Sequence, residues 1–241
     1  MFKNIPVVTK NLLIINILMW LAQITLPKAG INLTERLGLH FWSASDFNPV
    51  QLITYMFMHS DNDFTHLFFN MFSLLMFGPL SERALGNKRF LFYYITCGLG
   101  AAFIQEIVWQ FTWKDIFAPY FANAGGWTMD QAYQAINTAI ANGENIPALN
   151  ALLTIGASGC VFGILLAFGL LFPNLPLYIM FIPIPIKAKY MVIGYGAIEL
   201  MFGVTGTMDS VAHFAHLGGM LFGLILLLFW KKKGTFGDTY F

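Results

Sequence analysis

The chain has 241 residues, of which 57% are hydrophobic and only 10% are charged, and its formal net charge is +1. Because soluble domains are about one quarter charged, this composition indicates a polytopic membrane protein and excludes a soluble domain. The net charge argues neither for nor against a nucleic-acid partner, but no basic stripe interleaved with aromatic residues is evident, so nucleic acid is not a predicted partner. Cys97 and Cys160 both lie in apolar stretches and are expected to be buried thiols, not a disulfide pair.

Six apolar runs are long enough, or nearly so, to cross the about 30 Å of bilayer hydrocarbon. The first is expected to stay as a helix and not to be removed as a signal peptide, because no clear small-residue cleavage site follows it. The loop after it carries apolar pieces from Phe47 to Met58 and is expected to dip into the membrane interface. The runs are Val7–Leu26, Phe64–Leu80, Phe90–Trp109, Ala151–Phe172, Lys189–Val204 and His213–Trp230.

The connections between the later runs carry weaker signals. A short amphipathic helix is predicted over Gln131–Ala141, in the long loop between the third and fourth runs. Four prolines interrupt the apolar segment near Leu177–Ile186, so this segment is not expected to span the membrane. We hypothesise that the fifth run and the glycine-containing loop Gly203–Ser210 form a lateral gate for substrate.

The lysine and arginine residues predict the orientation of the chain, since cytoplasmic loops of membrane proteins are enriched in these residues. Ten of them fall on the side that holds both termini, and three, Lys28, Arg36 and Lys114, fall on the other. Both termini are therefore predicted to be cytoplasmic. The expected location is the inner (plasma) membrane of a bacterium, crossed several times.

Three polar residues are predicted to lie at one depth in the membrane. The second, fourth and sixth runs point in the same direction, and His66, Ser158 and His216 each lie fourteen residues before the inner end of their own run. At a rise of 1.5 Å per residue, each sits about 21 Å above the inner boundary. This shared level predicts a single site.

Ser158 lies in the sequence Gly156-Ala157-Ser158-Gly159. A serine in a membrane helix commonly bonds to its own helix backbone or packs as a small residue against a neighbouring helix. Here Gly159 permits close backbone approach, and Gly156 permits a turn that frees amide donors at the start of a helix. These amides could hold an oxyanion, so Ser158 is predicted to be a nucleophile.

His216 is the predicted general base, because an ionisable residue inside a span indicates function by default. The alternative is a neutral histidine bonded to a nearby carbonyl. Gly218 and Gly219 follow it and would let another helix come close. His213, one turn away, is expected to be interfacial or to act indirectly. His213 and His216 could also bind a metal, but no H-E-x-x-H pattern is present and no metal is predicted.

His66 and Asn70 are spaced i and i+4, so they share one helix face. Both can donate hydrogen bonds to a developing oxyanion, although they could merely satisfy each other. No acid lies at the level of His216 on these three runs, which predicts a Ser–His dyad unless Glu199 of the fifth run reaches it. We expect Glu199 to bond elsewhere in the bundle or to face water, and Phe162 to stack under the His216 ring.

These residues resemble the motifs of the rhomboid intramembrane serine proteases. The matches are Gly156-Ala157-Ser158-Gly159 to G-x-S-G, Ala215-His216-Leu217-Gly218-Gly219 to A-H-x-x-G, His66-Leu67-Phe68-Phe69-Asn70 to H-x-x-x-N, and Glu82-Arg83-Ala84-Leu85-Gly86 to E-x-x-x-G. The resemblance covers about residues 40–230 of a chain expected to be one membrane domain over 1–241. The Trp-Arg pair sought in the first loop is absent, and Phe41-Trp42-Ser43 is the nearest stretch.

The resemblance implies an all-α six-helix bundle with a water-filled cavity open to the outside. It implies Ser158 as nucleophile, His216 as base, and His66, Asn70 and the Ser158 amide as the oxyanion hole. The implied substrates are transmembrane segments of membrane proteins, cut without a metal or organic cofactor. Two other functions stay open: a catalytically inactive membrane chaperone on the same bundle, and a proton-coupled transporter using the histidines as a relay. No inverted repeat supports the transporter.

Overall fold

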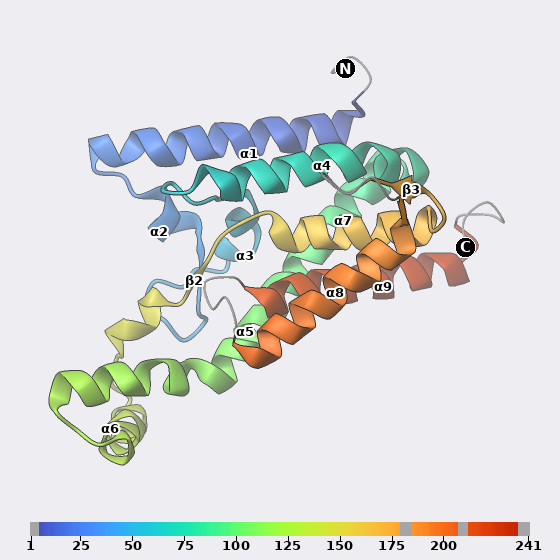
Figure 1. Cartoon of the computed structure of the whole chain (residues 1–241). Coiled ribbons are helices and arrows are strands. Elements are labelled where there is room, and N and C mark those ends of the chain that lie inside the picture. Colours follow the sequence, from blue (N-terminus) through green and yellow to red (C-terminus); the bar gives the residue numbers. More distant parts are fainter. Residues whose placement is uncertain (1–4, 179–184, 207–211, 236–241) are drawn as a thin grey trace.

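The computed structural model describes residues 5–178, 185–206 and 212–235. Its main elements are helices packed side by side, and α1 begins at the same end of the bundle at which α9 ends (Figure 1). The long helices are α1 Val7–Thr25, α4 Phe64–Leu85, α5 Asn87–Gly125, α6 Met129–Ala141, α7 Ser158–Leu171, α8 Ala188–Thr205 and α9 His213–Lys232. The short elements are η2 Leu26–Ala29, α2 Leu33–Leu37, β1 Leu39–His40, α3 Gln51–Thr54, η3 Tyr55–Phe57, η4 Pro147–Ala151, β2 Leu153–Thr154, β3 Pro176–Leu177 and β4 Ile186–Lys187.

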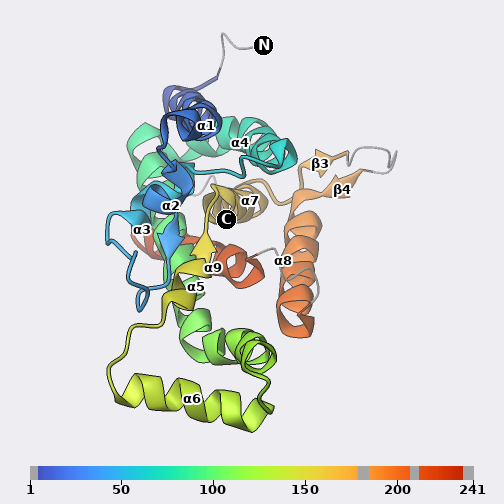
Figure 2. The same cartoon turned by 90° about the vertical axis from the view of Figure 1, so that its left-hand side faces the viewer.

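Helix α7 is the centre of the bundle, surrounded by α4, α5, α8 and α9 and in contact with each of them (Figure 2). It is apolar on every side, as a helix must be when neighbours cover its whole circumference. Its buried residues include Cys160, Ile164 and Phe168, which contribute to the main hydrophobic core or line it. A side chain at the start of α7 is therefore enclosed by protein, and not by lipid.

Among the described residues, four helices are long and apolar enough to cross a membrane: α1 with its extension η2, α4, α5 and α9. Helix α7 is apolar but shorter, and α8 is not among the four. Large hydrophobic residues on the outer faces are exposed, among them Leu18, Phe69, Phe92 and Phe229. The predicted all-α membrane bundle is confirmed, while the count of six spans stays a prediction.

In the fourth apolar run, Ala151–Phe172, only residues 158–171 are helical, so the helix is shorter than the run but begins after the turn predicted at Gly156. Residues before Ser158 form η4 and the strand β2, which pairs antiparallel with β1 through Leu39↔Thr154 and His40↔Leu153. Gly156 has φ +129°, a backbone conformation that interrupts any helix and favours glycine. Helix α7 therefore begins at Ser158 itself, with the first amides of the helix beside the serine side chain.

Helix α5, which contains the third apolar run, is longer than predicted and continues beyond Trp109 to Gly125. Its additional turns bury Trp113 and Phe117 against α6, and these residues form a second hydrophobic core. The predicted amphipathic helix is present as α6, whose N-terminus is closed by a capping box between Thr128 and Gln131. This α5–α6 projection extends away from the rest of the bundle (Figure 1).

The remaining connections are short elements. The apolar part of the first loop folds into α3 and η3, and the proline-rich segment carries the antiparallel strands β3 and β4 in place of a spanning helix. Helix α8 ends at Thr205, followed by Gly206 with φ +65°. The rest of the hypothesised gate, residues 207–210, lies outside the described residues.

Helix α1 is attached to α4 through Glu82, the first residue of the E-x-x-x-G motif. The fully buried Glu82 carboxylate accepts hydrogen bonds from the amides of Val8 (2.9 Å) and Thr9 (2.7 Å) and from the Thr9 hydroxyl (2.7 Å). The first amides of a helix have no partners within it, and they carry partial positive charge that favours a carboxylate. Glu82 therefore fixes the start of α1 against the end of α4.

Candidate active site

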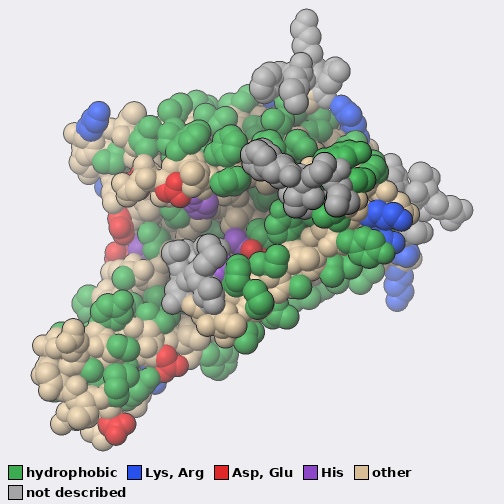
Figure 3. All heavy atoms as spheres, in the orientation of Figure 1, with side chains coloured by type: hydrophobic (Ala, Val, Ile, Leu, Met, Phe, Trp, Pro, Cys, Tyr) green, Lys and Arg blue, Asp and Glu red, His purple; other side chains and the backbone are tan. Residues whose placement is uncertain are grey.

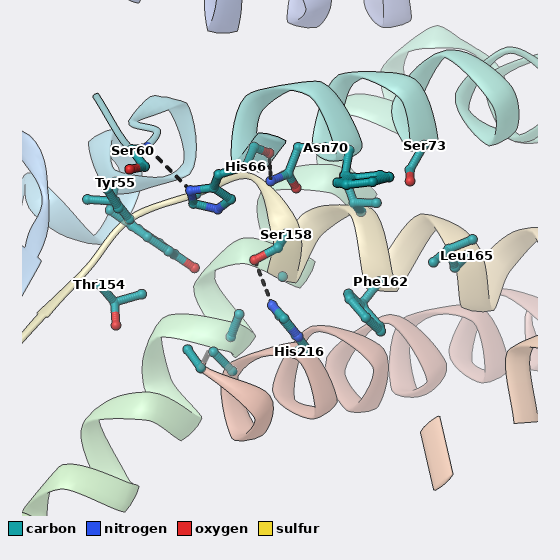
Figure 4. Close-up of a pocket in the computed structure, with 18 of the residues that line it drawn as sticks. Tyr55, Ser60, His66, Asn70, Ser73, Thr154, Ser158, Phe162, Leu165 and His216 are labelled. Carbon is teal, nitrogen blue, oxygen red and sulfur yellow. Dashed lines mark hydrogen bonds between the residues drawn. The ribbon is translucent and has the colours of Figure 1, made fainter. Parts of the chain in front are cut away.

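Ser158 and His216 come together between α7 and α9. The Ser158 Oγ and His216 Nε2 atoms are 2.8 Å apart, a hydrogen-bond distance, although 58 positions separate the two residues (Figure 4). His216 is buried and Ser158 is half-buried at the start of α7. This is the contact that a nucleophile and its general base require.

A close approach between α7 and α9 makes this contact possible. A Cβ atom at Gly219 would collide with the carbonyl oxygen of Gly159, and one at Gly159 would collide with Ala101 of α5. Only residues without side chains allow these backbones to pass at this separation. Gly159 and Gly219, two of the three supporting glycines predicted from sequence, thus lie against each other, one residue after Ser158 and three residues after His216.

Packing fixes one face of the His216 ring. The Phe162 ring lies parallel to it, with ring centroids 4.3 Å apart and an interplanar angle of 8°. Phe162 is one turn after Ser158 on α7, so this helix supplies both the stacking ring and the serine that contact His216. The stack restricts tilting of the imidazole and directs its Nε2 edge at the serine.

Glu199 of α8 contradicts its sequence-based expectation, because it reaches His216. Its Oε2 atom is 3.0 Å from His216 Nδ1 and 2.7 Å from His213 Nδ1. The expectation failed because α8 contacts both α7 and α9 and turns the carboxylate inward. Glu199, His213 and His216 have the donor types of a metal site; the absence of a metal stays a prediction.

His66 of α4 lies across from Ser158 and is oriented by the loop before it. The Ser60 amide donates to His66 Nδ1 at 3.3 Å, which leaves the ring proton on Nε2. A Cβ atom at Gly156 would lie only 2.8 Å from that Nε2. The glycine therefore keeps space open beside an N–H donor that points toward the serine.

Asn70 and the start of α7 supply further donors. The Asn70 Nδ2 atom donates to the His66 carbonyl oxygen at 2.9 Å, which uses one of its two N–H groups and leaves the other. The Ser158 amide is in the first turn of α7, where amides have no partner within the helix. His66, Asn70 and the Ser158 amide thus surround one side of the serine.

These side chains line a cavity of about 750 Å³ between the helices. Its wall includes Ser158, His216, His66, Asn70 and Phe162, and it continues along α4 through Phe69, Ser73 and Phe77. Figure 3 shows histidine side chains at the bottom of a hollow in an otherwise largely apolar face. The cavity is therefore reachable from outside the bundle although Ser158 and His216 lie among helices.

Three positioning contacts were missed by the sequence analysis. The Tyr55 backbone carbonyl accepts from the Gly156 amide at 3.0 Å, and the Tyr55 hydroxyl donates to the backbone carbonyl of Gly98 on α5 at 2.7 Å. The side chain of Gln23 bonds both the amide (2.9 Å) and the carbonyl (2.8 Å) of His59. A glutamine inside an apolar helix is a signal that could have found Gln23.

His59 lies beside His66, on the side of the loop that precedes α4. It is fully buried, and its ring centroid is 5.2 Å from that of His66. Burial, together with the neighbouring His66, lowers the pKa of His59 from 6.5 to about 3. It is therefore neutral at physiological pH and adds no positive charge beside His66.

Comparison with known proteins gives a family match over most of the chain. A model of the Rhomboid domain matches residues 46–233. The chain is 27% identical to rhomboid protease AarA of Providencia stuartii over 174 residues, which cover 71% of this chain and 52% of that protein. It is 45% identical to the rhomboid-named protein YdcA of Bacillus subtilis over 49 residues, 20% of this chain and 24% of that protein.

The matched region spans about half the length of AarA and less of YdcA. The family match nevertheless contains all four motifs, with Ser158, His216, His66, Asn70 and Glu199. Its residues form an apolar helical bundle, as an integral membrane protein of this kind requires. The chain belongs to the rhomboid family.

Proposed function

We propose that the chain is an intramembrane serine endopeptidase that cuts transmembrane segments of membrane proteins with Ser158 and His216. The observation that carries the proposal is the 2.8 Å contact between Ser158 Oγ and His216 Nε2 in a cavity among membrane helices. The similarity to a protein named a rhomboid protease supports the same reaction class.

The arrangement supports acyl transfer in two stages. His216 Nε2 takes the proton of the Ser158 hydroxyl as the oxygen attacks a peptide carbonyl. The resulting oxyanion accepts from the Ser158 amide, His66 Nε2–H and Asn70 Nδ2–H. His216 then gives its proton to the leaving amine, and an acyl-enzyme forms. Water, deprotonated by the same imidazole, attacks the ester and releases Ser158.

The surroundings favour a membrane-embedded substrate. The helices around the cavity expose large apolar residues, such as Phe69 on α4 and Leu200 and Met201 on α8, to their surroundings. A peptide that reaches this cavity from the bilayer must satisfy its own backbone polar groups, which a transmembrane helix does until it unwinds at the cut. The partners of the protein are thus transmembrane proteins and the lipid bilayer.

The distribution of charge supports cytoplasmic termini. Figure 3 shows most of the visible lysine and arginine side chains gathered at the end of the molecule where α9 ends. Lys231 and Lys232 lie in the last turn of α9, at this end of the molecule, while Ser158 begins α7 at its opposite end. By the enrichment of cations on the cytoplasmic side, the cavity opens toward the outside of an inner membrane.

A fluorophosphonate probe tests the assignment without knowledge of a substrate. Such probes form a covalent bond with a serine oxygen only when the serine is activated by a base. We expect the purified protein to be labelled, and Ser158→Ala and His216→Ala to stay unlabelled while folded. Equal labelling of Ser158→Ala would place the reactive serine elsewhere and refute the proposal.

A further inference from the structure

We propose that Glu199 is a positioning residue that completes a Ser158–His216–Glu199 triad, so that catalysis in this chain depends on a carboxylate from α8. The proposal rests on the proposed function, since it concerns how His216 acts on Ser158. In a Ser–His dyad, packing alone orients the imidazole; here a carboxylate from a third helix also orients it.

The three residues form one continuous line of hydrogen bonds through the imidazole. His216 Nε2 is 2.8 Å from Ser158 Oγ, and His216 Nδ1 is 3.0 Å from Glu199 Oε2. A neutral imidazole carries its proton on one nitrogen only. A carboxylate oxygen at Nδ1 can only accept, so it holds the proton on Nδ1. Nε2 is then left free to take the serine proton.

The carboxylate is itself held in place. His213 Nδ1 lies 2.7 Å from the same Oε2 atom, so two imidazoles share one oxygen of Glu199. Both histidines are buried, and only 11% of the Glu199 side chain is exposed. In such surroundings an ion interacts more strongly than in water. The imidazolium that forms during attack therefore has a fixed negative partner.

Glu199 acts from behind the imidazole and has no direct route to substrate. Among the described residues that line the cavity, α8 contributes Tyr195, and Glu199 is not one of them. Removing its charge should therefore change the rate of the chemical step and leave substrate binding unchanged. A residue that merely ties α8 to α9 would instead affect stability, or kcat and KM together.

The decisive variant is Glu199→Gln, which removes the charge and keeps the size of the side chain. Its matched control is Glu106→Gln, because Glu106 is also a buried acid with one backbone partner, the Trp42 amide at 2.8 Å, but lies on α5 away from His216. Glu199→Asp keeps the charge on a shorter side chain. For each variant, cleavage kinetics, the fluorophosphonate labelling rate and the melting temperature would be measured in the same detergent.

We expect Glu199→Gln to lower kcat and the labelling rate by about 10- to 100-fold and to leave KM unchanged. This is the effect expected from the loss of one charge-assisted hydrogen bond. Glu106→Gln should keep wild-type kcat, and Glu199→Asp should fall between wild type and Glu199→Gln. Wild-type kcat in a folded Glu199→Gln protein overturns the triad but leaves the dyad intact. If Glu199→Gln does not fold, Glu199→Ala takes its place, and wild-type kcat in a folded Glu199→Ala protein overturns the triad instead. Loss of the proposed function itself would appear separately, as an unlabelled wild type.

Discussion

Gly156→Ala tests whether the space beside His66 matters for catalysis. The substitution places a methyl group at φ +129°, a backbone conformation that L side chains rarely adopt, and 2.8 Å from His66 Nε2. The backbone strain alone costs about 1–3 kcal/mol, which lowers the melting temperature of a chain of this size by roughly 2–12 °C. The methyl group also displaces His66, and the loss of one oxyanion donor lowers kcat by about 10²–10³-fold.

A second glycine separates the two effects. Gly143, in the loop after α6, also has a positive φ, +68°, but a Cβ atom there would meet nothing within 4 Å. Gly143→Ala should therefore lower the melting temperature through strain and leave kcat unchanged. The assay is thermal unfolding together with cleavage of a model substrate by each purified variant. Wild-type kcat in Gly156→Ala would refute the placement of the oxyanion beside His66.

Three further predictions concern parts of the structure around the site. Glu82→Gln removes the carboxylate that holds the start of α1. It should destabilise the protein by about 1.5–3 kcal/mol, measured by thermal or denaturant unfolding, with kcat unchanged. An unchanged unfolding midpoint would contradict the role of Glu82. Because the pKa of His59 is about 3 when folded and 6.5 otherwise, the unfolded chain binds an extra proton between these values, so the melting temperature should fall from pH 6.5 towards pH 3. That fall should be smaller in His59→Phe, and equal slopes would show that His59 is not responsible. Finally, a chelator should leave the cleavage rate unchanged. Loss of cleavage with the chelator, and its recovery on addition of Zn²⁺, would instead identify Glu199, His213 and His216 as metal ligands.

The depth of the site could be predicted because α4, α7 and α9 are parallel. One count of residues from a common boundary then placed His66, Ser158 and His216 at the same level, and they line one cavity. That count did not include Glu199, because α8 runs in the opposite direction. Counted from Ala188, where α8 begins, Glu199 lies about 16 Å from the inner boundary. This is within one turn of the other three residues, so the signal was present in the sequence.

Other features had no such signal. The Ser60 amide that orients His66 is a backbone group, and its position depends on how the loop between η3 and α4 folds. Gly156 did indicate a helix start near Ser158, but the pairing of β1 with β2 before it joins segments more than a hundred residues apart and had no local signal. The extension of α5 depends on its contacts with α6. In each case tertiary contacts decided what local patterns left open.

Cleavage of a transmembrane model substrate by the purified protein, beside Ser158→Ala and His216→Ala, tests the central claim most directly. The substrate should carry small or helix-breaking residues near one end of its membrane segment. The account predicts that the wild type cuts within or beside that segment and that both folded variants fail. Cleavage by His216→Ala at the wild-type rate would contradict it and show that His216 is not the general base.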